Sequence, residues 1–174
     1  RAGLAYKWED VSEDTELEYI EWSCAASTIS PVAVFKPVKL EGTTVRRASL
    51  CNISEMERLG IGKKSVLSVI KSNKIIPKVI AVKQSEGAFE IPEECPVCKA
   101  KTEIRISPKS STKTLHCTNP DCTAKHAMKF TRFVSKAGMD IEGLSIQTIL
   151  RFINKGYISQ YADFYHLGRY AEEI

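Results

Sequence analysis

The sequence predicts a mainly β fold with an added α-helical part: an OB-type β-barrel, a small zinc finger and a helical segment. Three observations support this. Runs of β-branched and alternating residues fill the first half of the chain, four closely spaced cysteines follow, and apolar residues then recur at helical spacing. The 174 residues are enough for one ordinary domain or for two to three small ones.

The predicted barrel rests on five strand-like runs: residues 15–23, 31–40, 43–50, 65–71 and 75–82. Between the third and fourth runs, Ser54 is followed three residues later by Glu57. This spacing is typical of a capping box, so we expect a short helix ending at Gly60 or Gly62. Five short strands with a helix after the third indicate a Greek-key barrel of the OB type, and another small sandwich or barrel is the alternative.

The four cysteines form two pairs, Cys95-x₂-Cys98 and Cys117-x₄-Cys122, with eighteen residues between them. Two such pairs on tight turns can direct four thiolates at one tetrahedral zinc ion. Two disulfides or four reduced thiols are the alternatives, and His116 and His126 are possible substitute ligands. Four cysteines leave no open position for a catalytic water, so we expect a structural zinc and not a catalytic one.

Composition and charge exclude several classes of protein. Hydrophobic residues make up 43% of the chain, which is a globular composition, and the net charge of +4 is compatible with a polyanionic partner. No apolar run is long enough to span a membrane, and no signal peptide is recognisable. We therefore expect a cytoplasmic, monomeric protein without a membrane partner. The start at Arg1 suggests a chain cut from a longer protein.

The last third of the sequence is predicted to be helical. The spacing of Met128, Phe130, Phe133 and Val134 predicts one helix. A second helix is predicted by Ile146, Ile149, Leu150 and Ile153, with Gly156 as its C-cap, and a third is expected over residues 162–167. The glycine-containing loop before the second helix could offer backbone N–H groups of Gly143 to a phosphate, or could be a plain turn with Ser145 as N-cap.

For other polar and thiol side chains, the sequence predicts only whether they are buried or exposed. Arg46 and Arg47 are adjacent on a predicted strand and should face opposite sides. Three lysines near the last two strands, Lys71, Lys74 and Lys78, are expected at the surface. Cys24 and Cys51 lie far from the cluster in sequence and are expected to be small buried residues. No catalytic constellation stands out, so these residues indicate a binding module.

In order along the chain, several motifs together resemble bacterial NAD-dependent DNA ligases. They are AYKW at 5–8, SPVAVFKPV at 30–38, VRRASLCN at 45–52, GIG at 60–62, IIPKV at 75–79, CTNPDC at 117–122, FVSK at 133–136, MDIEGL at 139–144 and ADFYHL at 162–167. The resemblance covers essentially the whole chain, in register. Each motif alone is weak, whereas the ordered series is specific.

The resemblance implies a fragment of an enzyme that uses NAD, with magnesium, to adenylate a lysine and then seal nicks in duplex DNA. It divides the chain into the end of an adenylation domain (1–10), an OB-fold domain (11–90), a zinc finger (91–123) and the start of a helix–hairpin–helix domain (124–174). Lys7 matches a nucleotide-contacting lysine. The nucleophile motif Lys-x-Asp-Gly is absent from this chain, so we expect the chain alone to be inactive. The candidate DNA contacts are Arg46, Arg47, Asn52, Lys78 and Gly143.

The chain also departs from the family pattern, which suggests a divergent member. Cys24-Ala25-Ala26-Ser27 stands where the family has Gly-Arg-Thr-Gly. Cys51 replaces a histidine, Lys74 an acidic residue and Ser145 a glycine. The alternative function is a stand-alone OB and zinc module that binds single-stranded nucleic acid. That class stacks bases on exposed aromatic side chains, for which Tyr19, Trp22 and Phe35 are the candidates.

Overall fold

The computed structural model describes residues 11–73 and 75–173. They divide into two compact units, and each is described by itself. The barrel unit comprises residues 11–23, 30–92 and 104–115. The cysteine–helix unit comprises residues 24–29, 93–103 and 116–173.

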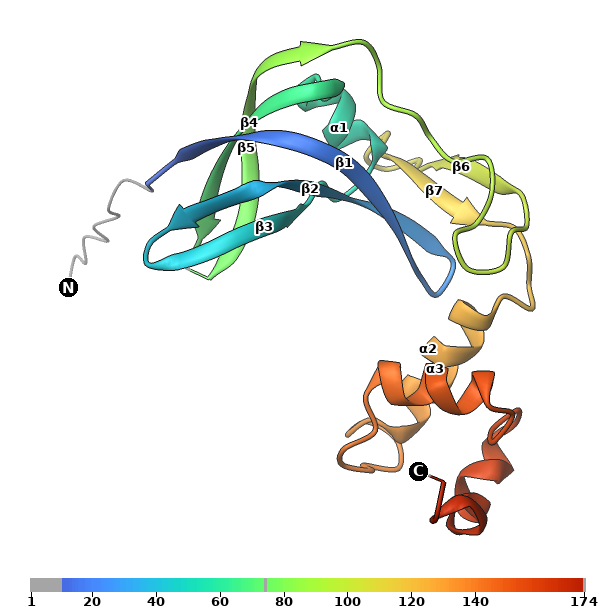
Figure 1. Cartoon of the computed structure of the whole chain (residues 1–174). Coiled ribbons are helices and arrows are strands. Elements are labelled where there is room, and N and C mark those ends of the chain that lie inside the picture. The colour runs from blue at the N-terminus through green and yellow to red at the C-terminus, as the bar shows by residue number, and fades with distance from the viewer. Residues whose placement is uncertain (1–10, 74, 174) are drawn as a thin grey trace, which may run out of the picture. The chain divides into compact units, whose positions relative to one another are not determined.

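Five strands form the barrel unit's main body: β1 (Glu13–Ala25), β2 (Thr28–Leu40), β3 (Thr43–Ser49), β4 (Lys63–Ser72) and β5 (Ile76–Glu86). Their order is β1-β4-β5-β3-β2, and an additional pairing of β1 with β2 closes the sheet (Figure 1). β1 pairs antiparallel with β4, β2 with β3 and β4 with β5, whereas β3 and β5 run parallel where Ser49 lies opposite Lys78. A closed five-stranded barrel in this order confirms the predicted OB-like fold.

Helix α1 (Ile53–Leu59) lies between β3 and β4, where a short helix was predicted. Its N-cap is Asn52, whose side-chain oxygen accepts a hydrogen bond from the Glu55 N–H at 2.9 Å. The prediction that Ser54 caps the helix is therefore wrong, because Ser54 already lies in the first turn. Gly60 ends the helix with φ of 67°, a left-handed conformation that glycine adopts without strain.

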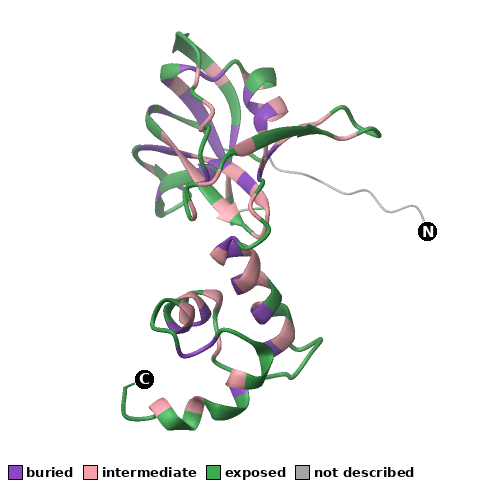
Figure 2. Ribbon diagram, turned by 90° about the vertical axis from the view of Figure 1, so that its right-hand side faces the viewer, coloured by how far each residue is buried: buried purple, intermediate pink, exposed green. Residues whose placement is uncertain are grey.

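The barrel core lies between the strands and one face of α1. Its fully buried side chains include Phe35, Leu40, Met56 and Leu67, and purple segments mark such positions along the strands in Figure 2. Alternation of buried and exposed residues along the strands explains why the sequence pattern located them. Lys71, expected at the surface, is instead buried on β4 with 8% of its surface exposed.

A short hairpin that the sequence did not predict occupies the interval between the two cysteine pairs. It consists of β6 (Thr102–Ile106) and β7 (Lys113–Cys117), and β7 lies next to β2 in the sheet. Within the barrel unit, the Lys113 N–H donates to Ser54 Oγ at 2.8 Å, and its ammonium group lies 2.9 Å from a Glu57 carboxylate oxygen. The hairpin is thus attached to α1.

Three helical segments form the second unit: α2 (Thr123–Val134), α3 (Ile146–Asn154) and the 3₁₀ segment η1 (Tyr161–Tyr170). All three were predicted at approximately these positions. Phe130, Ile149, Phe152 and Phe164 meet in a separate core. Ser145 caps α3 by accepting a hydrogen bond from the Thr148 N–H at 3.2 Å. Among the described residues, no helix is long and apolar enough to cross a bilayer.

Candidate metal centre and nucleic-acid surface

The four cysteines predicted as metal ligands come together in the cysteine–helix unit. The sulfur atoms of Cys95, Cys98, Cys117 and Cys122 all lie within 4.8 Å of one another. Cys95, Cys117 and Cys122 are buried and Cys98 is half-buried. Zinc–sulfur bonds of about 2.3 Å would place the four sulfurs about 3.8 Å apart in a tetrahedron. The cluster therefore fits a metal ion of this kind after shifts of about 1 Å or less.

Tight turns position the first pair of cysteines. The Cys95 N–H donates to the Ala100 carbonyl at 2.8 Å, and the Lys99 N–H donates to the Cys95 carbonyl at 3.0 Å. Lys99 adopts a positive φ of 59°, which turns the chain back sharply after Cys98. Both thiols consequently point to the same side of this turn, as the shared cluster requires.

The second pair is held by the end of β7, an Asn turn and the start of α2. The Asp121 N–H donates to the Asn119 side-chain oxygen at 2.9 Å, and Cys122 is the N-cap residue of α2. Lys125, one turn into α2, donates through its ammonium group to the Cys117 carbonyl at 3.1 Å. The role of Lys125 is not visible in the sequence, because a lysine in a helix gives no signal of what it contacts.

The electrostatics of the cluster favour a cation. Burial, opposed by hydrogen bonds from the Ala100 N–H and from neighbouring thiols, leaves the pKa of Cys98 lowered to about 6. Burial raises the pKa of Cys117 to about 12 and also raises the pKa of Cys122. Without a metal, the Cys98 thiol therefore loses its proton more readily than the thiols of Cys117 and Cys122. A divalent cation would displace the remaining protons and balance the thiolate charges.

The histidine considered as a substitute ligand and the two remote cysteines lie in different surroundings. His126 lies 3.9 Å from Asp121 and does not join the four sulfurs. Cys51 is exposed at a positive φ of 61°, so the expectation that it is buried is wrong. Cys24 is half-buried, and burial, followed by the charge of Cys95, raises the pKa of its thiol.

Both candidate arginines of β3 are exposed, and together with Tyr19, Glu21 and Val34 they line a hollow of about 260 Å³. The expectation that Arg46 and Arg47 face opposite sides is therefore wrong. Buried positions along β3 are three residues apart, at Val45 and Ala48, so simple alternation fails there. The β2–β3 register also shifts opposite this stretch.

The other candidate contacts of the barrel unit lie close to the end of β3. Lys78 is exposed on β5 and pairs with Ser49, the last residue of β3. Its charge also reaches Glu55 in α1 and contributes to lowering the pKa of that carboxyl, after the larger effect of a hydrogen bond from Arg58. Asn52 is half-buried, and its side-chain oxygen is occupied by capping α1. Its amide nitrogen is the group that could reach a phosphate.

Gly143 and Lys7 complete the candidate set. Gly143 belongs to the cysteine–helix unit and adopts a φ of 81° in the loop before α3, and a Cβ atom added at this glycine would meet no other atom within 4 Å. The positive φ, and not a lack of space, is what requires glycine there. Lys7 and Lys74 lie outside the described residues.

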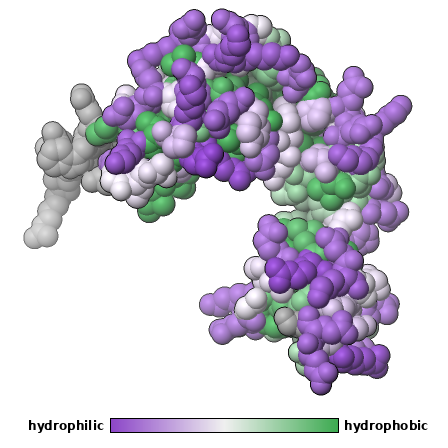
Figure 3. All heavy atoms as spheres, viewed as in Figure 1, coloured by the Kyte–Doolittle hydropathy of each residue, from purple (hydrophilic) through white to green (hydrophobic). Residues whose placement is uncertain are grey.

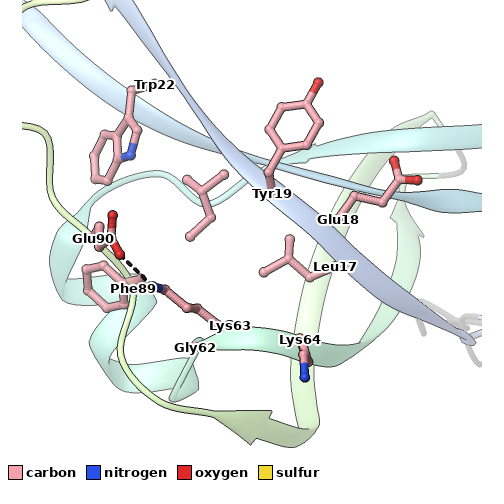
Figure 4. A pocket seen from close by; sticks show the side chains of 10 residues that line it. Leu17, Glu18, Tyr19, Trp22, Gly62, Lys63, Lys64, Phe89 and Glu90 are labelled. Atoms are coloured by element: carbon pink, nitrogen blue, oxygen red, sulfur yellow. Dashed lines mark hydrogen bonds and ion pairs between the residues drawn. The ribbon is translucent and has the colours of Figure 1, made fainter.

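A second hollow of the barrel unit measures about 440 Å³ and is lined by apolar, aromatic and charged side chains. Figure 4 shows Trp22 and Phe89 at one end of it and Leu17 and Lys64 at the other, with an ion pair between Lys63 and Glu90 beside the aromatic end. None of the candidate contacts lines this hollow. It shares Tyr19 with the hollow beside Arg46 and Arg47, but neither arginine lines it.

The face drawn in Figure 3 is mostly hydrophilic, with scattered apolar spots over each unit. The single-stranded-nucleic-acid alternative required exposed aromatic side chains. Phe35 is completely buried and Trp22 is partly buried against the barrel core, whereas Tyr19 is 57% exposed. One exposed ring does not make the series of stacking platforms that this alternative calls for.

Comparison with known proteins agrees with the barrel. The family model described as the NAD-dependent DNA ligase OB-fold domain matches residues 14–89. The whole chain aligns with proteins named DNA ligase from Ruminiclostridium cellulolyticum, at 46% identity, and Lachnoclostridium phytofermentans, at 47% identity. The chain belongs to the bacterial NAD-dependent DNA ligase family. A DNA ligase from Rhodopirellula baltica is 37% identical over 95% of the chain.

This ligase-family chain spans about a quarter of the length of the curated relatives it matches, 26% of the first two and 24% of the third. It thus corresponds to a fragment of such a ligase. The resemblance inferred from the ordered motifs is confirmed.

Proposed function

We propose that this chain is the part of an NAD-dependent DNA ligase that grips nicked duplex DNA, and that it contains one structural zinc ion. The observation that carries the proposal is the basic surface on neighbouring strands of an OB barrel of this family. Arg46, Arg47 and Lys78 are exposed there, and β3 and β5 are joined at Ser49 and Lys78. Arginine and lysine side chains on one surface can neutralise successive phosphates of a duplex.

The ion pair between Arg47 and Glu21 does not compete strongly with DNA. Arg47 donates to a Glu21 carboxylate oxygen at 2.6 Å, but both side chains are about half exposed. An exposed pair of this kind contributes about 0–1 kcal/mol, whereas an arginine–phosphate contact can be bidentate. Arg47 can therefore turn from Glu21 to a phosphate at little cost.

The zinc proposal rests on the donor set. Four cysteine sulfurs within 4.8 Å form a closed S₄ site of the kind that holds structural zinc. When bound, zinc would link the turn around Cys95 and Cys98 to the end of β7 and the start of α2. The chain's own residues supply every ligand, so the ion would have a structural role and no position open for substrate.

We assign the module limits as 1–10 for the end of an adenylation domain, 11–90 for the OB fold, 91–123 for the zinc finger and 124–174 for the start of a helix–hairpin–helix domain. The complete protein would use NAD, with magnesium, to adenylate a lysine and seal the nick, as a cytoplasmic monomer. Lys7 would contact the nucleotide, and the loop that contains Gly143 would offer backbone N–H groups to a phosphate. This chain lacks a Lys-x-Asp-Gly motif, so incubation with NAD should leave its mass unchanged.

The DNA-binding proposal is tested in the full-length protein by changing Arg46 and Arg47 together to alanine. We expect nicked-duplex affinity to fall, and the slope of log affinity against log salt to become shallower by about two units if both contact phosphate. Lys64→Ala is the control. Lys64 is an exposed lysine of the same unit, and it does not line the hollow that Arg46 and Arg47 share. Fluorescence anisotropy at several salt concentrations measures both quantities. Equal slopes for the double variant and the parent would contradict the assignment.

A further inference from the structure

One lysine fastens the loop that carries the second cysteine pair. Lys125, near the start of α2, is half-buried, and its ammonium group donates to the Asn119 carbonyl at 2.5 Å and to the Cys117 carbonyl at 3.1 Å. Its backbone N–H donates to the Cys122 carbonyl at 2.8 Å. Lys125 therefore contacts the main chain of both cysteines of this pair, through its side chain at Cys117 and through its backbone at Cys122.

The position of Lys125 on the helix is electrostatically unfavourable by itself. The N-terminus of a helix carries a partial positive charge, so acidic residues are favoured in the first turn and lysines are not. The first turn of α2, residues 123–126, contains no acidic residue, and the N-cap residue is Cys122, a candidate metal ligand. Negative charge beside the start of this helix would remove the conflict, and the thiolates of a metal centre would supply it.

The charge of the metal centre fits this arrangement. A divalent ion bound by four thiolates has a net charge of about −2, and buried charge is costly unless an opposite charge lies nearby. The Lys125 ammonium group, held at the carbonyls of Cys117 and Asn119, brings a positive charge to the second ligand pair. Charge-assisted hydrogen bonds are stronger than neutral ones, so they keep the ammonium group there. The lysine therefore stabilises the metal-bound state more than the metal-free state.

We propose that Lys125 is a positioning residue for the metal centre: it holds the loop 117–122 in the metal-binding conformation and offsets part of the thiolate charge. This proposal rests on the zinc centre proposed above. Replacing a residue that orients metal ligands from outside the ligand set changes metal affinity by about 10- to 100-fold. Helix α2 itself is held by Ala127, Phe130 and Val134 in the core of the helical segments, so the effect should fall on metal binding and not on the helix.

The test compares variants of the full-length protein in competition for zinc with a chromogenic chelator. Lys125→Met removes the charge and the donors, and it should bind zinc about 10- to 100-fold more weakly. Lys125→Arg keeps both, so it should retain most of the affinity. Lys129→Met is the matched control, because Lys129 lies exposed one turn further along the same helix, and it should bind zinc as tightly as the parent.

Cobalt(II) loading and circular dichroism separate positioning from folding. Thiolate-to-cobalt absorption bands report the geometry of a four-sulfur site, and a residue that only stabilised the fold would leave them unchanged in the folded variant. We expect these bands to shift in Lys125→Met and to return in Lys125→Arg, while the helical signal of both variants stays at the parent's level.

Two results would overturn the proposal: parental zinc affinity with parental cobalt bands in Lys125→Met, or an arginine variant that binds zinc no better than the methionine variant. Lys125→Gln, which keeps donors without the charge, decides the matter if Lys125→Met fails to fold, because it should still bind zinc more weakly than Lys125→Arg. The parent separates the two proposals. A reduced parent that binds neither metal refutes the zinc centre and this role of Lys125 with it, whereas a zinc-binding parent beside an unaffected Lys125→Met refutes the role alone.

Discussion

The barrel and the cysteine segment are stabilised in different ways. The barrel unit buries large apolar side chains such as Phe35, Leu40 and Leu67 completely. In the cysteine segment, defined as residues 93–103 and 116–122, the buried residues are Cys95, Cys117 and Cys122. Apolar packing can stabilise the first region alone. The second has almost no apolar core, so its order depends on what its sulfurs bind.

Metal removal should have the largest effect, and it should be confined to the cysteine segment. A structural zinc ion contributes about 10–16 kcal/mol in apparent binding free energy at neutral pH. Chelation, or Cys95→Ser, should therefore abolish amide protection in residues 93–103 and 116–122 while the barrel strands keep theirs. Hydrogen exchange followed by mass spectrometry measures both regions in one sample, and Cys51→Ser serves as the control.

Loss of protection throughout the barrel under the same treatment would show that the two regions do not differ as described. Full retention of protection in the cysteine segment after verified metal removal would show that local hydrogen bonds suffice there. Such bonds include the Cys95–Ala100 and Asp121–Asn119 contacts.

The second prediction removes a core side chain from the barrel and leaves the cysteine segment unchanged. Phe35→Ala should lower the free energy of unfolding of the barrel by about 3–5 kcal/mol, because it leaves a cavity in a packed core. Zinc stoichiometry should stay at one per chain. Urea unfolding followed by fluorescence and elemental analysis measure these quantities. Tyr19→Ala, at a position that is 57% exposed, should change stability far less. If Phe35→Ala also caused loss of the metal, the stabilities of the two regions would be coupled, and the prediction would be wrong.

The same contrast explains how much the sequence could predict. The five barrel strands were predictable because each is a run of β-branched or alternating residues, and the cysteine cluster was predictable because ligand spacing is local. Arg46 and Arg47 were misplaced because a shifted register beside them interrupts the alternation. Lys71 was misplaced because charge alone predicts exposure, whereas its place on β4 is set by packing.

Features that depend on contacts between distant segments were missed. Hairpin β6–β7 is stabilised by a bond between Lys113 and Ser54, which are 59 positions apart. The turn after Cys24 is likewise joined to the second cysteine pair, because the Cys117 N–H donates to the Ser27 carbonyl, and no pattern in either segment indicates the other. At α1 the competing caps were both visible in the sequence, but Asn52 was counted as a DNA contact and so was overlooked as the cap.

The third prediction concerns the role of Asn52 as the N-cap of α1. Asn52→Ala should destabilise the barrel unit by about 1 kcal/mol, since the Glu55 N–H loses its acceptor. Asn52→Asp should retain the stability, because its carboxylate can cap the helix and is favoured at a helix N-terminus. Chemical unfolding of both variants provides the measurement. Equal stability of Asn52→Ala and the parent would show that the cap contributes nothing to the barrel.

The smallest effect is expected in the cysteine–helix unit, away from the cysteines. Asp163 accepts hydrogen bonds from the backbone N–H groups of Ser159 and Gln160, at 2.7 and 2.9 Å, and these bonds lower the pKa of its carboxyl to about 2 from the usual 3.8. Because the folded-state pKa is depressed, the carboxylate stabilises the start of η1 above pH 4. That stabilisation is lost as pH falls from about 4 to about 2.

Asp163→Asn should therefore lower the melting temperature of this unit slightly at neutral pH, and the difference from the parent should disappear near pH 2. Protonation of the cysteine thiolates in acid also destabilises the unit, but it affects both proteins equally and cancels in the difference. Circular dichroism of the helical signal as a function of temperature and pH gives the comparison. A difference that persists unchanged down to pH 2 would mean that the introduced amide disrupts packing, and that the charge of Asp163 is not what stabilises η1.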